Sequence, residues 1–434
     1  MTAAQTTVSA PPPEGAVVRA PLKLKVPIAL TVVLVLLGLL LTLAPRSGTA
    51  VYALDPTKKA QRIDITLGDL PVPADATIAV VMVILVLITA WCWFAALTRR
   101  SAGTWAPTVF AVLAVFAFIT WAAAGASGRV PVVGLLGGAL SLAVPLVFGA
   151  LGGIIGERVG VVNVAIEAQF LLGAFSAAIA STITKNPYVG LIGAMIGGVL
   201  VAFVLAAFAI KYLVEQVIIG VVLNVLVLGL TSFLYQIVLV PNTAALNSPV
   251  SFESIKIPLL GDIPIIGPIL FNQPFIVYLM YIVVPLVAFS LYRTRWGLRV
   301  RAVGEYPKAA DTVGIKVNPT RFWNVLLAGA LAGIGGAYFT LASVPTFTQN
   351  MTNGLGFIAL AAVIFGRWDP VRATFAALLF GFAQNLQNTF TALSSPVPKE
   401  FLLMLPYIVT LIAVAGFVGR IQGPAASGKP YIKS

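Results

Sequence analysis

The sequence predicts an all-α fold, a polytopic helical membrane protein with about 10–12 transmembrane helices. Of its 434 residues, 59% are hydrophobic and only 9% are charged, and the mean hydropathy is +1.00. Soluble domains carry roughly 25% charged residues. Long apolar runs recur along the whole chain, each close to the length of about 20 residues that one crossing requires. A soluble enzyme is therefore excluded as the main interpretation.

The apolar runs give about twelve expected spans, taken in order along the chain. The run at 354–366 is too short for a straight crossing, so it is expected to be a half-helix or a re-entrant segment. Residues 1–25 lack periodicity and are expected to be a disordered cytoplasmic tail, and 421–434 a cytoplasmic C-terminal tail. The expected spans are 26–44, 77–97, 105–124, 132–155, 163–182, 189–210, 217–240, 274–292, 322–341, 354–366, 371–390 and 401–419.

The basic surplus of the chain predicts its orientation. There are 27 Lys and Arg residues against 14 Asp and Glu, a formal net charge of +13. If the N-terminus is cytoplasmic and every run crosses, most of the basic residues fall in cytoplasmic segments, as the positive-inside rule requires. Both termini are then cytoplasmic. Nucleic-acid binding is not needed to explain the charge.

Composition also excludes several kinds of chemistry. The chain has no histidine and a single cysteine, Cys92, so we expect no metal centre, no disulfide framework and a small apolar role for Cys92. No phosphate-binding G-x-x-x-x-G-K-[ST] loop is present. A membrane-embedded enzyme lacks a plausible catalytic set, and the chain has no cofactor of its own by this interpretation.

Two stretches of the sequence resemble each other in layout. Residues 163–198 and 354–381 each contain an apolar segment, a short turn with Asn186-Pro187 or Asp369-Pro370, and a span rich in small residues. In the orientation above, the first pair of spans leaves the cytoplasm and the second pair enters it. This layout is that of an inverted repeat, as in many transporters.

Asn163 and Glu167 are the first candidates for a transport path. They follow a glycine-rich run that ends at Gly160, and their spacing of four places them on one helix face. A carboxylate inside a span is costly and indicates a functional site by default. The alternative, left open, is that Glu167 only joins helices by pairing with a donor on another span. Amide side chains in later spans have the same two interpretations, a polar path or hydrogen bonding between helices: Asn224, Gln384, Asn385, Gln387 and Asn388.

The long loop 293–321 is rich in basic residues and contains its own helix pattern. A short helix is expected from Glu305 to Val313, because Pro307 suits a first helical turn and Gly314 suits a C-cap. A short docked helix between two spans fits contact with a cytosolic partner. The alternative is an ordinary loop facing anionic lipids.

Several passages resemble the permease subunits of binding-protein-dependent ABC importers, in the group that handles ribose, branched-chain amino acids and nucleosides. The likeness is greatest to nucleoside-type permeases and covers a core of about 130–420, with 26–125 as an N-terminal extension of three spans. The passages are 157–167 (Glu-Arg-Val-Gly-Val-Val-Asn-Val-Ala-Ile-Glu), 214–220 with Asn224, 304–310 with Gly314-Ile315, and 354–359 with 366–370 (Gly-Arg-Trp-Asp-Pro).

The resemblance implies the partners: a second, related permease in a heterodimer, a cytosolic ABC ATPase that binds ATP and Mg, and an extracytoplasmic solute-binding lipoprotein. It also implies that the protein lies in a bacterial cytoplasmic membrane and contains an ATPase-coupling segment. This segment departs from the family signature, because Lys308 replaces the Glu before the two alanines. The coupling candidates are Gly304, Glu305, Pro307, Ala309, Ala310, Gly314 and Ile315. The translocation-path candidates are Asn163, Glu167, Glu215, Asn224, Phe357, Gln384, Asn385 and Asn388.

The expected function is therefore that of an importer subunit, moving nucleosides or related sugar-containing solutes by alternating access, with ATP hydrolysis on separate chains. The alternative is a secondary transporter of a small polar solute, in which Glu167 relays a proton. One intramembrane carboxylate and no histidine make a poor relay, which disfavours this alternative.

Overall fold

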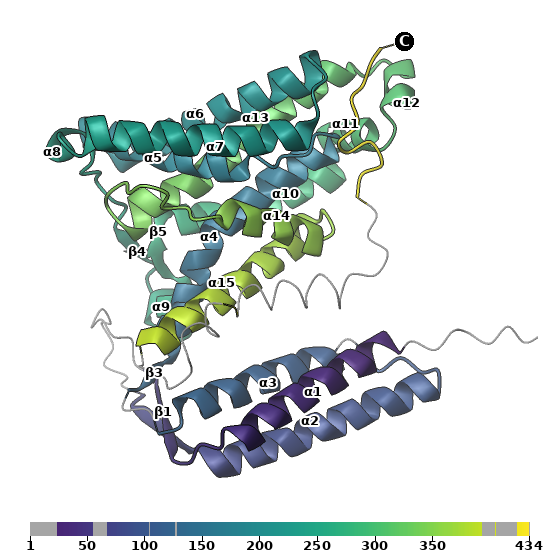
Figure 1. The fold of residues 1–434 in the computed structure, drawn as a ribbon, viewed down its shortest axis with the longest axis vertical. Helices are drawn as coiled ribbons and strands as arrows, with labels where there is room; N and C mark the ends of the chain where they lie inside the picture. Colours follow the sequence, from purple (N-terminus) through teal and green to yellow (C-terminus); the bar gives the residue numbers. More distant parts are fainter. Residues whose placement is uncertain are drawn as a thin grey trace, which may run out of the picture. The chain divides into compact units, whose positions relative to one another are not determined.

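A computed structural model describes residues 24–54, 67–103, 105–125, 128–392, 404 and 423–433. The chain divides into two compact units (Figure 1). The first contains Met1–Gly48 and Pro73–Ala124. The second contains Thr49–Val72 and Gly125–Ser434.

The first unit is a bundle of three apolar helices, α1 (Lys25–Leu43), α2 (Ala74–Leu97) and α3 (Trp105–Ala123). Its small core includes Leu85, Phe110 and Cys92, so the expected apolar role of Cys92 is confirmed. The Trp121 indole N–H donates to the carbonyl oxygen of Ala44 at 2.8 Å, which joins the end of α3 to the end of α1. The helices expose apolar residues outward, as spans in contact with lipid do.

The second unit contains the long helices, and π-helical turns at Ala207–Lys211, Tyr235–Leu239 and Phe339–Ser343 extend three of them. The long helices are α4 (Val132–Arg158), α5 (Ile166–Thr184), α6 (Pro187–Ala206), α7 (Gln216–Leu234), α10 (Phe275–Arg293), α13 (Val317–Tyr338) and α15 (Pro370–Ala392). The short helices are α8 (Thr243–Leu246), α9 (Ile266–Leu270), α11 (Arg295–Glu305), α12 (Pro307–Thr312) and α14 (Leu355–Phe365), with a 3₁₀ turn at Leu260–Asp262.

The strands are short and lie between helices. β1 (Thr49–Ala53) is flanked by β2 (Asp69–Pro73) and β3 (Val130–Pro131), and β1 pairs with β3 in parallel, with Tyr52 opposite Val130. β4 (Ser254–Lys256) and β5 (Asn272–Pro274) pair antiparallel, with Ile255 opposite Gln273. The strands are few and short, so the fold is helical, as predicted.

Nine helices of the described part are long and apolar enough to cross a membrane, and they correspond to the first nine expected spans. The run at 354–366 forms α14, whose 11 residues extend for about 16 Å at 1.5 Å per residue. That length is about half of the hydrocarbon core, so α14 is a half-helix. α15 has the length of a span, but its second half carries four amide side chains. The expected span 401–419 lies outside the described residues, apart from Met404.

Close contacts between small residues hold the second unit together around α13. A Cβ on Gly198 of α6 would lie 2.1 Å from the carbonyl oxygen of Gly329 on α13, and one on Gly173 of α5 would lie 2.8 Å from that of Gly333. Without a hydrophobic force between helices in lipid, such close backbone packing is a main source of stability. α4 in turn packs along α15 and α13 packs along α6.

The two stretches that look alike in sequence also have similar turns. Asn186 caps α6 through its side chain, which accepts from the amide of Tyr188, and Pro187 is the first helical residue. Asp369 accepts from the amide of Arg372 in the same way, ahead of Pro370 at the start of α15. The opposite orientation of the two stretches in the membrane stays a prediction.

Candidate functional site

The N-termini of α5 and α14 meet in the interior of the second unit. Glu167, in the first turn of α5, is buried, and its Oε1 accepts from the Thr352 hydroxyl at 2.6 Å and the Gly354 amide at 2.8 Å. Its Oε2 accepts from the Gly356 amide at 2.6 Å. The first amides of a helix have no partner within the helix, and the positive end of the helix dipole favours an anion there. Glu167 therefore caps α14 from another helix.

The start of α5 is capped from α7 in a similar way. The Asn224 Oδ1 accepts from the Ala168 amide at 2.9 Å, and its Nδ2 donates to the Val164 carbonyl oxygen at 3.0 Å. Asn163 and Gln169 form a buried pair of amides with reciprocal hydrogen bonds of 3.0 and 3.3 Å. The irregular segment 159–165 before α5 is held by such contacts, because Asn224 partners its Val164 carbonyl oxygen and Gln216 its Val162 amide.

Asn163, Glu167 and Asn224 are thus brought together, and each is hydrogen-bonded within the protein. Their observed contacts join helix ends, which is the second of the two interpretations that the sequence leaves open. Their part in a solute path stays a prediction. Gln169 was not predicted; its position as an amide two residues after Glu167 was the only indication in the sequence.

The other path candidates lie on different elements. Glu215 is the N-cap of α7, where its carboxylate accepts from the amides of Val217 and Ile218 at 3.2 and 3.0 Å. Asn385 donates to the carbonyl oxygens of Gly134 and Leu135 and so ties α15 to the start of α4. The rest are Phe357, which is exposed on α14, Gln384 and Gln387, which are partly buried on α15, and Asn388, which is exposed.

A groove of about 670 Å³ lies between α4, α9, α10 and α15. Its lining is apolar, with side chains such as Leu140, Met280 and Phe375, and none of the predicted path residues is part of it. It does not suit a polar solute. Within the described residues, no group of three or more metal-ligating side chains is found.

The loop 293–321 folds into two short helices, α11 and α12. The expected short helix is present as α12, with Pro307 at its first position and Gly314 at φ +85° after its end. The amide of Gly314 donates to Asp311 O and that of Ile315 donates to Ala310 O, at 2.9 and 3.0 Å, which is the hydrogen-bond pattern of a Schellman C-cap. The predicted start is wrong, because Glu305 ends α11 and α12 begins two residues later.

Exposed apolar side chains flank α12 at both of its ends. Tyr306 is 69% exposed and Val313 is 75% exposed, whereas Ala310 is buried against the rest of the unit. Lys308 and Ala309 are exposed between them. Two exposed apolar side chains at the tip of a loop between spans favour this helix as a contact site for another protein.

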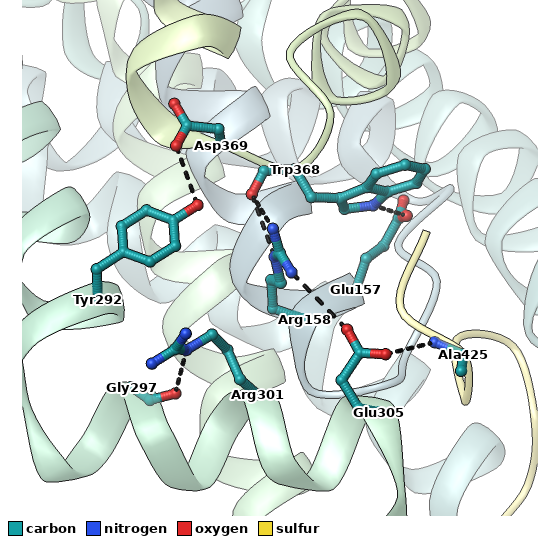
Figure 2. Close-up of polar contacts among 9 residues, drawn as sticks. All are labelled: Glu157, Arg158, Tyr292, Gly297, Arg301, Glu305, Trp368, Asp369 and Ala425. Carbon is teal, nitrogen blue, oxygen red and sulfur yellow. Dashed lines mark hydrogen bonds and ion pairs between the residues drawn. The ribbon is translucent and has the colours of Figure 1, made fainter. Parts of the chain in front are cut away.

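The end of α11 is attached directly to the end of α4 (Figure 2). A Cβ on Gly304 would lie 2.0 Å from the Arg158 carbonyl oxygen, so the two backbones touch. The Glu305 carboxylate lies 3.9 Å from the Arg158 guanidinium and accepts from the Ala425 amide at 3.3 Å. The Gly304 carbonyl oxygen accepts from the Ala426 amide at 2.9 Å, so the C-terminal segment 423–433 packs against α11.

A second part of this network holds the turn between α14 and α15. Arg158 donates from Nε and Nη2 to the Trp368 carbonyl oxygen at 3.2 and 3.1 Å, and the Trp368 indole N–H donates to the buried Glu157 carboxylate. Asp369 accepts from the Tyr292 hydroxyl at 3.0 Å. Glu157, Arg158 and Trp368 were not predicted as site residues, although the charges of Glu157 and Arg158 at the end of a span were an indication in the sequence.

Comparison with known proteins identifies the class. Residues 135–414 match the family described as the branched-chain amino acid transport system permease component. The guanosine ABC transporter permease protein NupQ of Bacillus subtilis is 39% identical over 303 residues, which are 68% of this chain and 95% of that protein. The nucleoside permease protein NupC of Lactococcus lactis is 37% identical over 299 residues, 67% of this chain and 94% of that protein.

A third relative, the putative glucose ABC transporter permease protein TsgC13 of Haloferax volcanii, is 35% identical over 265 residues, 60% of this chain and 79% of that protein. No solved structure matches the chain. The chain belongs to the permease-component family of the branched-chain amino acid transport system. It is a multi-pass membrane subunit of an ABC transporter and not an enzyme, which confirms the resemblance seen in the sequence.

Proposed function

We propose that this chain is the permease subunit of an importer that moves nucleosides across a bacterial cytoplasmic membrane by alternating access, and that α11 and α12 receive the force of the ATPase. The observation that carries the proposal is the α11–α12 loop, with an exposed apolar tip and a base joined to α4. The names of NupQ and NupC favour nucleosides. The name of TsgC13 keeps related sugar-containing solutes as the second possibility.

The proposed complex contains a second, related permease as the other half of a heterodimer, a cytosolic ATPase that binds ATP and Mg, and an extracytoplasmic solute-binding lipoprotein. Both termini are placed in the cytoplasm. This orientation is supported by the basic residues, which are concentrated in loop 293–321 and in the other segments that it assigns to the cytoplasmic side, as the positive-inside rule requires. The apolar tip of α12 then faces the cytosol, where an ATPase can reach it.

The path is proposed to pass the junction of α5, α7 and α14, where helix ends meet inside the unit. Discontinuous helices near the middle of a membrane are a common feature of transporter binding sites. A change of conformation there requires contacts that differ between the inward- and outward-facing states. The caps at Glu167 and Asn224 join three helices at this point, so a relative movement of α14 alters them.

The coupling assignment is tested by the double variant Glu305→Arg with Ala310→Asp. Arginine at 305 faces Arg158, and Ala310 is 3% exposed, so aspartate there buries an unpaired charge. We expect uptake of labelled guanosine to be abolished and the ATPase to be lost on purification, while the permease still inserts. The matched control is Glu253→Arg with Ala245→Asp, the same changes at exposed positions after α7. Normal ATPase association in the first variant would contradict the assignment.

A further inference from the structure

The turn between α14 and α15 is held in a strained conformation. Arg367 and Trp368 are consecutive non-glycine residues in the left-handed region, with φ +54° and +55°. That conformation is sterically unfavourable for L-residues with a Cβ. The turn also lacks room to relax, because a Cβ on Gly366 would lie 2.4 Å from the Ala373 amide nitrogen. Strained backbone persists only where surrounding contacts enforce it, and it is frequent in switching segments.

Two adjacent residues of α4 supply the enforcing contacts, and we call Glu157 and Arg158 the turn clamp. The Arg158 guanidinium holds the Trp368 carbonyl oxygen with two donors, and the Glu157 carboxylate holds the Trp368 indole N–H. Both the main chain and the side chain of the strained residue Trp368 are therefore held by the C-terminal end of α4 (Figure 2). Trp368 is buried, and Gly423 of the C-terminal segment packs against its ring.

The turn clamp is also the place where α11 rests. Gly304 contacts the Arg158 backbone without room for a Cβ, and Glu305 faces the Arg158 side chain at 3.9 Å. That ion pair is partly exposed and contributes little by itself. The backbone contact is the rigid one, so a displacement of α11 moves the end of α4 and with it the donors on Trp368.

We infer that the turn clamp transmits movement of the coupling loop to α14 and α15, with Arg158 as a positioning residue. The inference rests on the proposed function, because it takes α11 and α12 as the segment that the ATPase moves. When α11 shifts, the clamp loosens or tightens its hold on Trp368, and the strained turn moves between two conformations. α14 follows, and its N-terminus is the one that Glu167 caps.

The test compares three variants in the complete transporter with its ATPase. Arg158→Met removes both donors at similar length, Arg158→Lys keeps the charge on a single donor nitrogen, and Arg100→Met removes the same charge from an exposed position after α2, outside the coupling loop. The readout is hydrogen exchange of the turn, whose amides at 367, 368 and 369 are all hydrogen-bonded, with and without ATP. This readout does not require the solute to be known, and a merely structural role would not change its dependence on ATP.

In the wild type and in Arg100→Met, we expect ATP to change exchange at the turn by about fivefold or more, the lower end of ordinary coupling between sites. Arg158→Met loses this dependence while the ATPase remains bound, and Arg158→Lys retains part of it. An ATP effect of wild-type size in Arg158→Met would overturn the inference. If that variant does not assemble, Trp368→Phe, which removes the indole donor together with part of the ring, must still reduce the ATP effect. Failure of the proposed function would appear as an ATPase that does not associate with the coupling loop. Failure of this inference would appear as an unchanged ATP effect in Arg158→Met with the ATPase still bound, so the two failures are distinguishable.

Discussion

Replacing Glu167 by Gln tests the interpretation of the α5–α14 junction most sharply. The carboxylate accepts three hydrogen bonds, from the Thr352 hydroxyl and from the amides of Gly354 and Gly356. Gln keeps one oxygen and turns an NH₂ group toward these donors, so at least one buried donor loses its partner. A hydrogen bond to a charged group contributes about 1.5–3 kcal/mol, and an unpaired buried donor costs about 1–3 kcal/mol. We expect a loss of about 2–4 kcal/mol in the free energy of unfolding.

The assay is thermal unfolding of the detergent-solubilised protein, followed by size-exclusion fluorescence. At about 2–4 °C per kcal/mol for a domain of 150–250 residues, the apparent melting temperature should fall by roughly 4–16 °C. The matched control is Glu215→Gln, which alters another carboxylate cap at an exposed position. There we expect about 1 kcal/mol or less.

Equal shifts in the two variants would refute the interhelical cap, since burial would then make no difference. Guanosine uptake is a second assay for Glu167→Gln and Glu215→Gln. We expect Glu167→Gln to impair guanosine uptake, because α14 is no longer fixed at its N-terminus. Wild-type stability together with wild-type uptake would reduce Glu167 to a passive residue of the interior. Wild-type stability with lost uptake would instead assign the carboxylate to the solute path.

Three further substitutions test the helix packing and the hydrogen bonds of Asn224. Gly198→Ala forces a Cβ to within 2.1 Å of the Gly329 carbonyl oxygen and should lower the free energy of unfolding by about 1–3 kcal/mol. Its control, Gly229→Ala, places a Cβ with nothing within 4 Å and should be neutral or stabilise α7 by up to about 1 kcal/mol. Melting curves that rank the two variants the other way would contradict the close α6–α13 contact. Asn224→Ala leaves the Ala168 amide and the Val164 carbonyl oxygen unpaired and should cost about 2–4 kcal/mol in the same assay, with an unchanged melting temperature as the contrary result.

Features encoded by neighbouring residues were predictable from the sequence. Apolar runs gave the first nine spans, and the short run at 354–366 already indicated the half-helix α14. Pro307 and Gly314 gave α12 with its C-cap, since proline and glycine act on the backbone at their own positions. The family was recognisable because local passages such as 157–167 carry it.

The remainder depends on residues that are distant in sequence. Nothing near Glu167 indicates that its partners are the amides of Gly354 and Gly356, since pairing across a fold follows from packing and not from spacing. The same reason explains why Arg158 and Trp368 were missed as partners, 210 residues apart. Glu215 was assigned to the path through resemblance, yet its own helix already uses its carboxylate as an N-cap.

The most direct test of the central claim is the energy source of transport. The permease, its partner permease, the ATPase and the solute-binding lipoprotein are reconstituted in proteoliposomes, and uptake of labelled guanosine is measured with ATP and with a protonophore. We predict uptake that requires ATP and survives the protonophore. Uptake that persists without ATP and collapses with the protonophore would contradict the account and favour proton coupling through Glu167.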